Sequence, residues 1–513
     1  MKKKFYKMDK LRTRTKLEIG LVTLFLVLLI IVTSVGSINR TISSSHDDIN
    51  TFIRNSNGNY WDATASNLQA AIDDLGSNGG IVWLPNTTIM VKQVWFNETN
   101  ITLKGYNSCI KLDETKALQF ADGQGVLTIQ ADFTTVDGVE IDGSMEWNGT
   151  NLPAVTTVNI NGIKLNSVEN CTIRNCEVHH TQFNGIEMHG SWHNLIEYNH
   201  VHHIGNISDT DNVGSTGIRG KATAPCCRYN IVQYNYVHDI REHGIKFYED
   251  GSNPLDPLHN KILYNTVGNV NMGDWDGDGN PYGACIVVPS CYNLIQGNTL
   301  LINDLCEGGI QVRQHNTVVG NIIRDKTSSN GIAYIQVSQG NCIVSYNNIN
   351  GADLPPYSGG DKTAIGIKLD RASNCTITGN YITHCRYPIH IHSKSGDPSE
   401  PTSAAYNVIT NNILFGGSVM LKTDNDVVPG TVQNFIANND LQGLNDGGEI
   451  EVSGTAEKTN NIIKGNIGYE YSSYQYIPVG DSNPYSDPSA GAMWLNNTTG
   501  ELGIYNGYSW IWK

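Results

Sequence analysis

The most regular feature of the chain is a short apolar motif that recurs along its middle. A Gly-Ile-x-apolar unit is found at 162–165, 185–188, 217–220, 244–247, 309–312 and 366–369, with looser copies beginning at 285, 334, 388 and 449. A second unit follows it: an apolar residue, two more residues, Asn, one residue and another apolar residue, as in Ile196, Asn199 and Val201. Alternation over such short segments indicates strands, and repetition of the pair indicates a solenoid.

These repeats predict an all-β fold, a right-handed parallel β-helix over residues 59–470. Alternate side chains of each strand would point inward, and the Asn at one turn of every coil could hydrogen-bond to its counterparts. Leucine-rich repeats are the main competing architecture. They require Leu at several fixed positions, which this repeat does not favour.

The 11 cysteines do not occur as CxxC pairs, which argues against a zinc site. Four of them, Cys171, Cys291, Cys342 and Cys375, come just before apolar strands, and we expect them to stack in the core. A disulfide from the adjacent Cys226 and Cys227, or from Cys109, remains an alternative outside the cell.

The N-terminus has the charge pattern of a signal-anchor. Residues 1–16 are strongly basic, and a charge-free apolar stretch runs from Ile19 to Val35. We predict a cytoplasmic tail (1–16), a transmembrane helix (17–36) and a polar linker (37–58), with the bulk of the chain at the cell surface. A cleaved signal peptide and a secreted protein are the alternative.

The predicted β-helix is flanked by an element at each end. A short amphipathic helix with Ser66 as N-cap would place Leu68, Ala71, Ile72 and Leu75 on one face. The strand IVWLP (81–85) follows Gly79 and Gly80, and this opening resembles that of pectate-lyase-like β-helices, in which the helix covers the first coil. Residues 471–513 would form a small aromatic-rich β capping module around Thr499–Gly500, which resembles terminal modules of phage and surface β-proteins. A simple hairpin that caps the open C-terminal coil is the alternative.

Net charge is −15, so the chain lacks the positive field of a nucleic-acid binder, and we predict no nucleic-acid partner. The polar positions of the Gly-Ile-x-apolar strands are more informative. Stacked at about 4.8 Å per coil, they would form two solvent-facing rows. One row contains Lys164, Glu187, Arg219, Lys246, Val287, Gln311, Gln336, Lys368 and His390, and the other contains Asn166, His189, Lys221, Tyr248, Pro289, Arg313, Ser338, Asp370 and His392.

The middle coils of these rows would bring six reactive side chains together: Glu187, His189, Arg219, Lys221, Lys246 and Tyr248. Polyuronate lyases and epimerases need such a set. A cation neutralises the sugar carboxylate, a base removes the C5 proton, and an acid protonates the leaving oxygen or returns a proton to the other face. Neighbouring cations would lower the pKa of Lys221 or Lys246 and make either a candidate base.

The segment NGIEMHG (184–190) resembles the YGFDPHE segment of mannuronan C5-epimerases, and the resemblance extends over roughly residues 60–205. It implies that Glu187 matches the family's catalytic Asp and His189 its catalytic His. Asn184 departs from the family, which has Tyr at that place. The motifs of polygalacturonases (NTD, paired Asp, GHG and RIK) are not evident, which argues against inverting hydrolysis by two acids.

Two other groups of residues could bind a metal. The insertion GDWDGDGNPYG places Asp274, Asp276, Asp278 and Asn280 like the first half of an EF-hand loop, so calcium is a candidate cofactor, although Cys285 stands where the terminal Glu belongs. Six histidines (His179, His180, His202, His203, His238 and His243) are expected at coil corners. They could form a metal cluster only if the corners stack closely.

The sequence thus supports two functions. The first is a cell-surface lyase or C5-epimerase acting on an acidic polysaccharide. The second is a non-catalytic surface protein, structural or adhesive, that binds glycans. The sequence leaves open which sugar is bound, whether turnover occurs, and the oligomeric state.

Overall fold

The computed structural model describes residues 51–113, 115, 123–144, 159–205, 215–222, 227–249, 258–270, 283–303, 306, 308–325, 332–351, 364–394, 403–424, 431, 433–444, 450–454, 461–467, 479–480, 493–496, 502–505 and 510–512. The predicted basic tail, the predicted anchor and most of the linker lie outside these residues. No helix among the described residues is both long and apolar enough to cross a membrane. The chain divides into two units, Met1–Phe52 and Ile53–Lys513, and the elements below belong almost entirely to the second.

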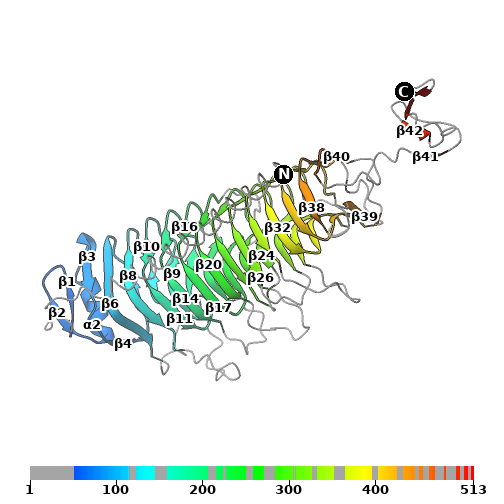
Figure 1. Ribbon diagram of the computed structural model, residues 1–513. Coiled ribbons are helices and arrows are strands. Elements are labelled where there is room, and N and C mark those ends of the chain that lie inside the picture. The colour runs from blue at the N-terminus through cyan, green and yellow to red at the C-terminus, as the bar shows by residue number, and fades with distance from the viewer. Residues whose placement is uncertain are drawn as a thin grey trace, which may run out of the picture. The chain divides into compact units, whose positions relative to one another are not determined.

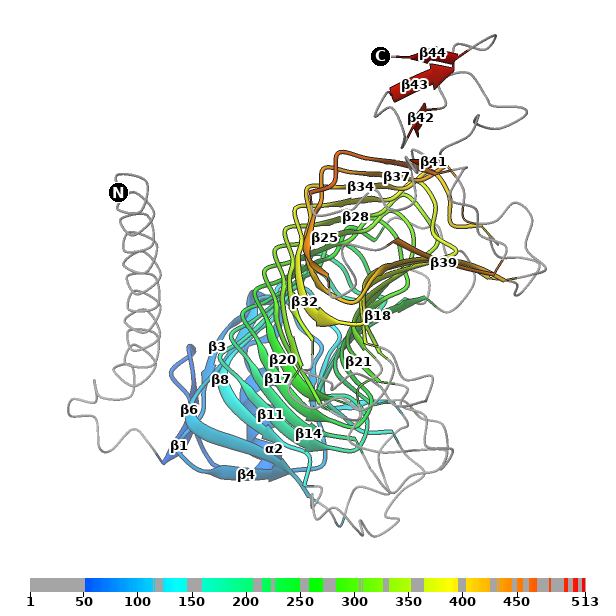
Figure 2. The same cartoon turned by 45° about the vertical axis from the view of Figure 1, so that its right-hand side comes forward.

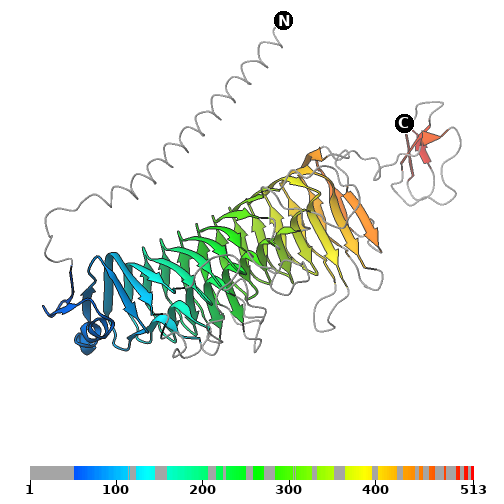
Figure 3. The ribbon, with the colours of Figure 1, turned by 90° about the horizontal axis from the view of Figure 1, so that it is seen from below.

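The second unit is a right-handed parallel β-helix, as predicted, whose coils stack one after another (Figure 1, Figure 3). One face of every coil belongs to a parallel 13-stranded sheet. Its strands are β5 (Val94–Phe96), β7 (Gly125–Ile129), β9 (Asn161–Asn166), β12 (Ile186–His189), β15 (Thr216–Ala222), β18 (His243–Glu249), β21 (Ala284–Val288), β24 (Gly308–Val312), β27 (Ala333–Ser338), β30 (Ile365–Asp370), β33 (Tyr387–Ser393), β36 (Val419–Thr423) and β39 (Ile450–Gly454). We call this face the site wall.

Each coil continues through two further faces, which Figure 2 shows obliquely along the stack. The strand after the site wall belongs to β3 (Gly80–Trp83), β10 (Thr172–Arg174), β13 (Leu195–Glu197), β16 (Ile231–Gln233), β19 (Lys261–Leu263), β22 (Leu294–Gln296), β25 (Thr317–Val319), β28 (Ile343–Ser345), β31 (Thr376–Thr378), β34 (Val408–Thr410), β37 (Phe435–Ala437) and β40 (Ile462–Lys464).

The third face consists of β4 (Thr88–Val91), β11 (Glu177–Thr181), β14 (His200–Ile204), β17 (Tyr236–Ile240), β20 (Thr266–Val270), β23 (Thr299–Ile302), β26 (Ile322–Asp325), β29 (Asn348–Asn350), β32 (Tyr381–Cys385), β35 (Ile413–Gly416) and β38 (Asp440–Leu444). Two long strands, β6 (Ile101–Leu112) and β8 (Thr135–Asp142), run through both the second and the third face.

The first coil is covered by β1 (Phe52–Asn55), β2 (Tyr60–Asp62), α2 (Ala65–Asp73) and the 3₁₀ turn η1 (Gly76–Asn78). The apolar face predicted for the helix is buried, since Leu68, Ala71, Ile72 and Leu75 are at most 2% exposed. The predicted cap Ser66 was wrong. Thr64 is the N-cap because its backbone is extended and its hydroxyl accepts a hydrogen bond from the Asn67 amide (3.4 Å).

The interior holds two ladders of buried Asn, one on each side of the second face. The predicted ladder includes Asn199, Asn235, Asn265, Asn298, Asn321, Asn347, Asn380, Asn412 and Asn439. In each step a side-chain amide donates to the carbonyl oxygen of the next Asn, at 2.9–3.0 Å. The second ladder stands five residues earlier in the coils and was missed, and it contains Asn194, Asn230, Asn260, Asn293 and Asn316.

The glycine of the repeat is dictated by a tight corner between two faces. A Cβ at Gly217 would lie 2.7 Å from the Gly244 carbonyl oxygen of the next coil and would also meet the Val237 side chain of the third face. Gly162 and Gly185 meet the same obstacles in their own coils. The glycine of the motif therefore indicates a close approach between the backbones of successive coils, and the rest of the motif indicates a strand.

The described cysteines are all buried and form no disulfide with one another, as the core interpretation predicted. Cys171 and Cys375 hold positions in the second Asn ladder, because their amides donate to Asn194 and Asn407 (both 2.9 Å). Cys109 and Cys227 form no disulfide, and Cys226 lies outside the described residues.

The C-terminal segment contains a separate small sheet. The predicted strands around Thr499–Gly500 are β42 (Met493–Asn496) and β43 (Leu502–Tyr505), which pair antiparallel. β41 (Val479–Gly480) and β44 (Trp510–Trp512) complete four strands.

Candidate functional site

The register of the site wall brings the predicted rows together. Glu187 pairs with Lys164 on one side and Arg219 on the other, and Arg219 pairs with Lys246. In the neighbouring row His189 pairs with Lys221, and Lys221 with Tyr248. The six predicted residues therefore lie on three adjacent strands, β12, β15 and β18. The side chain of Tyr248 lies outside the described part of the structure.

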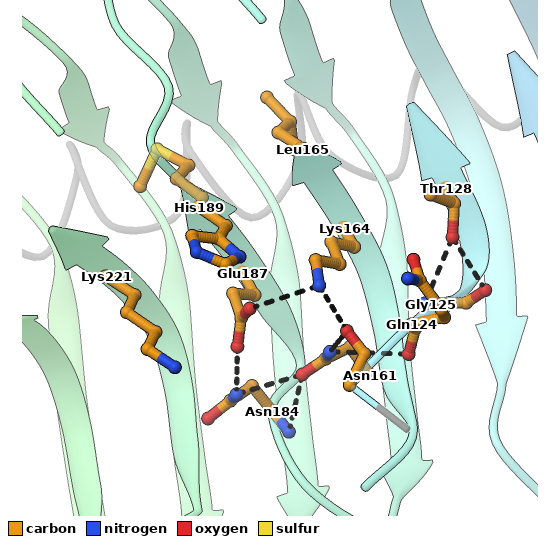
Figure 4. Close-up of polar contacts among 12 residues, drawn as sticks. Gln124, Gly125, Thr128, Asn161, Lys164, Leu165, Asn184, Glu187, His189 and Lys221 are labelled. Atoms are coloured by element: carbon orange, nitrogen blue, oxygen red, sulfur yellow. Dashed lines mark hydrogen bonds and ion pairs between the residues drawn. The ribbon is translucent and has the colours of Figure 1, made fainter. Parts of the chain in front are cut away.

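Glu187 is the centre of a hydrogen-bonded cluster (Figure 4). Its Oε2 accepts a hydrogen bond from the Asn184 side chain at 2.7 Å, and its Oε1 lies 3.8 Å from Lys164 Nζ. Asn184 is fixed in turn by Asn161, whose side-chain oxygen accepts from it at 2.9 Å. Asn184, which departs from the epimerase pattern, thus orients the carboxylate.

The expectation that this row faces solvent was wrong at its first two positions. Lys164 is 6% exposed and Glu187 is 3% exposed. Both point away from the core, but Lys164 Nζ donates to the carbonyl oxygen of Gly123 in an earlier coil, and Glu187 is enclosed by Lys164 and Asn184. Lys164 therefore belongs to the site, although sequence reasoning placed it in the row and not among the reactive residues.

His189 has the properties of a neutral imidazole. It lies beside Glu187 on the outer side of the same strand (Figure 4), and its Nδ1 is buried without a hydrogen-bond partner among the described residues. Burial lowers the pKa of His189, and the nearby Lys164 cation lowers it further. An unprotonated ring at neutral pH can accept a proton.

The next two coils supply three half-buried cations, Arg219, Lys221 and Lys246. The Arg219 guanidinium lies 5.2 Å from the centre of the Phe183 ring, and Lys221 is half-buried on the same strand. Lys246 Nζ lies 3.4 Å from Glu242. Burial lowers the pKa of Lys246, Glu242 opposes this effect, and Arg219 adds to it.

Glu242 was missed by sequence reasoning, because it precedes its strand and matches no repeat position. Burial disfavours its charge, but His243, 2.8 Å away, and Lys246 hold the pKa of Glu242 down at about 2. The carboxylate therefore stays ionised and limits the net positive charge that Arg219 and Lys246 present.

A second polar cluster lies farther along the same wall. The His392 ring lies 3.1 Å from Asp424, and Lys368 lies 3.4 Å from Asp370. His390 is only 8% exposed, and neither of its ring nitrogens has a hydrogen-bond partner among the described residues. Burial, followed by repulsion from His392 and Lys368, lowers the pKa of His390 to about 3. The rows contained Lys368, Asp370, His390 and His392, but their burial was not predicted, and Asp424 was missed.

The predicted metal sites have different outcomes. The calcium loop, Asp274, Asp276, Asp278 and Asn280, lies outside the described residues. The six histidines were expected at coil corners, but five lie on strands of the third face and His243 begins β18. The corner assignment was wrong because β11, β14 and β17 extend past these positions; His180 and His203 have left-handed backbones (φ 53° each), but the strands continue through them.

Comparisons with known proteins agree on the fold. The family model described as right-handed beta helix region matches residues 124–279, and the model described as periplasmic copper-binding protein (NosD) matches residues 253–431. No curated protein matches the sequence.

Solved β-helices match at low identity. The A-module of the Azotobacter vinelandii mannuronan C-5 epimerase AlgE6 is 14% identical, with 79% of this chain and 94% of that chain covered and a TM-score of 0.41. The tailspike of the E. coli bacteriophage HK620 is 13% identical, with 77% and 75% covered and a TM-score of 0.48. PfbA, a surface adhesin of Streptococcus pneumoniae, is 16% identical, with 78% and 86% covered and a TM-score of 0.42. At these identities and TM-scores the matches assign no function to this chain.

Proposed function

We propose that this protein acts on an acidic, uronate-containing polysaccharide as a lyase or C5-epimerase, with the site wall around Glu187 and His189 as its active site. The observation that carries the proposal is the environment of His189. A half-buried imidazole with a lowered pKa lies beside an oriented carboxylate, and three cations follow on the next two coils. A structural surface gains nothing from burying Lys164 and Glu187 there, since a buried ion pair is weak support for stability.

The proposed chemistry assigns each group one task. Arg219 and Lys221 neutralise the sugar carboxylate, which acidifies the C5 proton. His189 accepts that proton, while Glu187 holds the neighbouring Lys164 cation in place. In a lyase, the C4–O bond then breaks, a C4=C5 double bond forms, and the leaving oxygen takes a proton. In an epimerase, a proton returns to C5 from the opposite face. Tyr248 and Lys246, on the next strand, are the proposed proton donors.

The test is incubation of the full-length chain in D₂O with polymannuronate, polyguluronate, polygalacturonate and polyglucuronate. Ultraviolet absorbance reports unsaturated uronate, and proton NMR reports deuterium exchange at C5. We expect His189→Ala to lower the rate at least about 100-fold, as for loss of a general base. Lys261→Ala, which removes an exposed lysine from β19 on another face, is the matched control. Absence of both products with every polymer would refute catalysis.

Saturable binding to one of these polymers without turnover would instead support the non-catalytic, glycan-binding surface protein. The same variants separate the two functions. Arg219→Ala and Lys221→Ala should weaken binding in either case, whereas His189→Ala should leave binding intact if the imidazole acts only in proton transfer.

Two further parts of the proposal concern residues outside the described structure. We propose that residues 17–36 anchor the protein and leave the β-helix outside the cell, which protease treatment of intact cells tests. We also propose that the loop 274–280 binds calcium. Calorimetric titration with Ca²⁺ should show a heat that Asp276→Asn and Asp278→Asn remove, and equal heats in all three proteins would refute the site.

A further inference from the structure

The third face of the β-helix carries a ladder of histidines across three successive coils. On β11, β14 and β17 the register aligns His179 with His202 and His202 with His238. Their rings stack in parallel, with centroids 5.1 and 5.3 Å apart. Two residues earlier on the same strands, Glu177 aligns with His200. Imidazoles and carboxylates thus occupy two neighbouring columns.

The two columns are joined by diagonal contacts, from the first column of one coil to the second column of the next. Glu177 Oε1 lies 3.0 Å from His202 Nε2, and His200 Nε2 lies 2.7 Å from His238 Nε2. The diagonal puts three ligands close together: one ligand atom from each of Glu177, His200 and His202 lies within 4.8 Å of the other two, and His200 Nδ1 is 3.7 Å from Glu177 Oε1.

These separations match those of ligands around one metal ion. Bonds of about 2.0–2.1 Å in tetrahedral geometry place two ligand atoms about 3.3 Å apart, between the 3.0 and 3.7 Å found here. Access is also suitable. The side chains of Glu177 and His200 are 47% and 40% exposed, whereas that of His202 is 11% exposed. An ion could enter from solvent and retain water ligands.

Hydrogen bonds from neighbouring residues determine which ring nitrogen of His200 and of His202 is free to bind a metal ion. Asp239 Oδ2 lies 2.7 Å from His238 Nδ1 and accepts a hydrogen bond from it, so Nε2 of a neutral His238 is an acceptor. His200 must therefore carry its proton on Nε2, which leaves the lone pair of Nδ1 directed toward Glu177. Metal-binding histidines commonly have their other nitrogen held in this way.

His202 has an equivalent partner. Nδ1 of His202 lies 2.6 Å from Nδ1 of His203. When His202 carries its proton on Nδ1, it donates to His203, and the lone pair of His202 Nε2 is directed toward the Glu177 carboxylate. Without a proton or a cation between them, Nε2 and the Glu177 oxygen would be two acceptors at 3.0 Å.

The neighbouring cluster of Asp142, His179 and His180 has similar residue types but is already satisfied. Asp142 accepts hydrogen bonds from Lys111 (2.9 Å) and from the Ser144 amide (2.7 Å). A lysine cation at that distance opposes a second cation, so this cluster is the weaker site.

We propose that Glu177, His200 and His202 form a binding site for a divalent transition-metal ion, with His203, His238 and Asp239 as positioning residues. Two imidazoles and one carboxylate favour ions such as Zn²⁺ or Cu²⁺ over Ca²⁺ or Mg²⁺, which prefer oxygen alone. The site shares no residue with the proposed uronate site, and it lies before the segment matched by the copper-binding family model. It therefore stands or falls independently of both.

The test uses the full-length chain without a histidine tag, stripped with a chelator. Calorimetric titration with Zn²⁺ should show stoichiometric binding that His200→Ala, His202→Ala and Glu177→Gln each weaken at least tenfold. Asp239→Ala should weaken it about 10- to 100-fold. The matched control is His193→Asn, since His193 stacks on Tyr229 outside the ladder and its left-handed backbone (φ 58°) suits Asn.

Electron paramagnetic resonance with Cu²⁺ adds a direct readout of the ligands. Nitrogen hyperfine structure from two imidazoles should reduce to one in His200→Ala, and the carboxylates of the loop 274–280 offer no nitrogen. Stoichiometric Zn²⁺ affinity unchanged in His200→Ala and Glu177→Gln, or none in the unmodified chain, would overturn the proposal. If His200→Ala fails to fold, the near-isosteric Glu177→Gln decides.

Discussion

The Asn ladder offers a sharp test of what stabilises the stacked coils, because a buried member and an exposed Asn are adjacent in sequence. Asn347 is 1% exposed, whereas Asn348 is exposed on β29. The Asn347 side chain donates to the Val318 carbonyl (3.1 Å) and to Asn380 Oδ1 (2.9 Å). Its oxygen accepts from both the amide and the side chain of Asn321, each at 2.9 Å.

Replacing Asn347 with Ala removes these four hydrogen bonds, but some of the partner groups keep another hydrogen bond. Asn380 Oδ1 still accepts from the backbone amide of residue 347 (3.0 Å), and the Asn321 side chain keeps its bond to Ile295. The Asn321 amide loses its acceptor. One buried unpaired donor costs about 1–3 kcal/mol, and the three remaining lost bonds cost about 0.5–1.5 kcal/mol each, so we expect a loss of about 2.5–7.5 kcal/mol. Asn348→Ala should cost less than about 0.5 kcal/mol.

The assay is urea denaturation of the full-length chain followed by circular dichroism, combined with hydrogen exchange. Because solenoids can unfold in segments, the midpoint alone is insufficient. Exchange should accelerate locally in β25, β28 and β31 in Asn347→Ala and remain unchanged in Asn348→Ala. Equal shifts in both variants, or a loss spread evenly over the chain, would refute the reasoning that the ladder satisfies specific buried amides.

Three other predictions follow from the described contacts. Gly217→Ala should destabilise the protein by about 1–3 kcal/mol in chemical denaturation, because its Cβ would lie 2.7 Å from the Gly244 carbonyl oxygen; no loss would mean that the corner can relax. Lys164→Met should cost about 3–5 kcal/mol by leaving Glu187 buried without its cation, and a double-mutant cycle with Glu187→Leu should recover part of this loss; simple additivity would contradict the pair. Since burial lowers the pKa of His390 to about 3, while an unfolded His titrates near about 6.5, the unfolded chain binds more protons between these values. Stability should therefore fall as pH decreases through this window, and His390→Gln should flatten the profile; an unchanged slope would show that His390 is not the group responsible.

Much of the fold is encoded locally. Short strands follow from alternating side chains, and the wall register follows because each Gly-Ile-x-apolar unit must place its Ile over the Ile of the previous coil to fill the interior. For that reason the pairs Glu187–Arg219 and Arg219–Lys246 could be predicted from sequence. The second Asn ladder was missed, although it could also be predicted from sequence, because an Asn precedes several members of the first ladder by five residues, as Asn194 precedes Asn199.

What only the tertiary structure decided is the environment of the reactive groups. Burial of Lys164 depends on Gly123, 41 residues earlier, and on a coil corner whose path no local pattern specifies. The diagonal between Glu177 and His202 joins positions 25 residues apart in different columns, so it depends on side-chain rotamers as well as register. The sequence alone determined which residues share a face, since side-chain direction repeats with the strand. The burial, the hydrogen-bond partners and the protonation of the reactive side chains depend on segments from other coils that pack over the face. Only the tertiary structure therefore decided them.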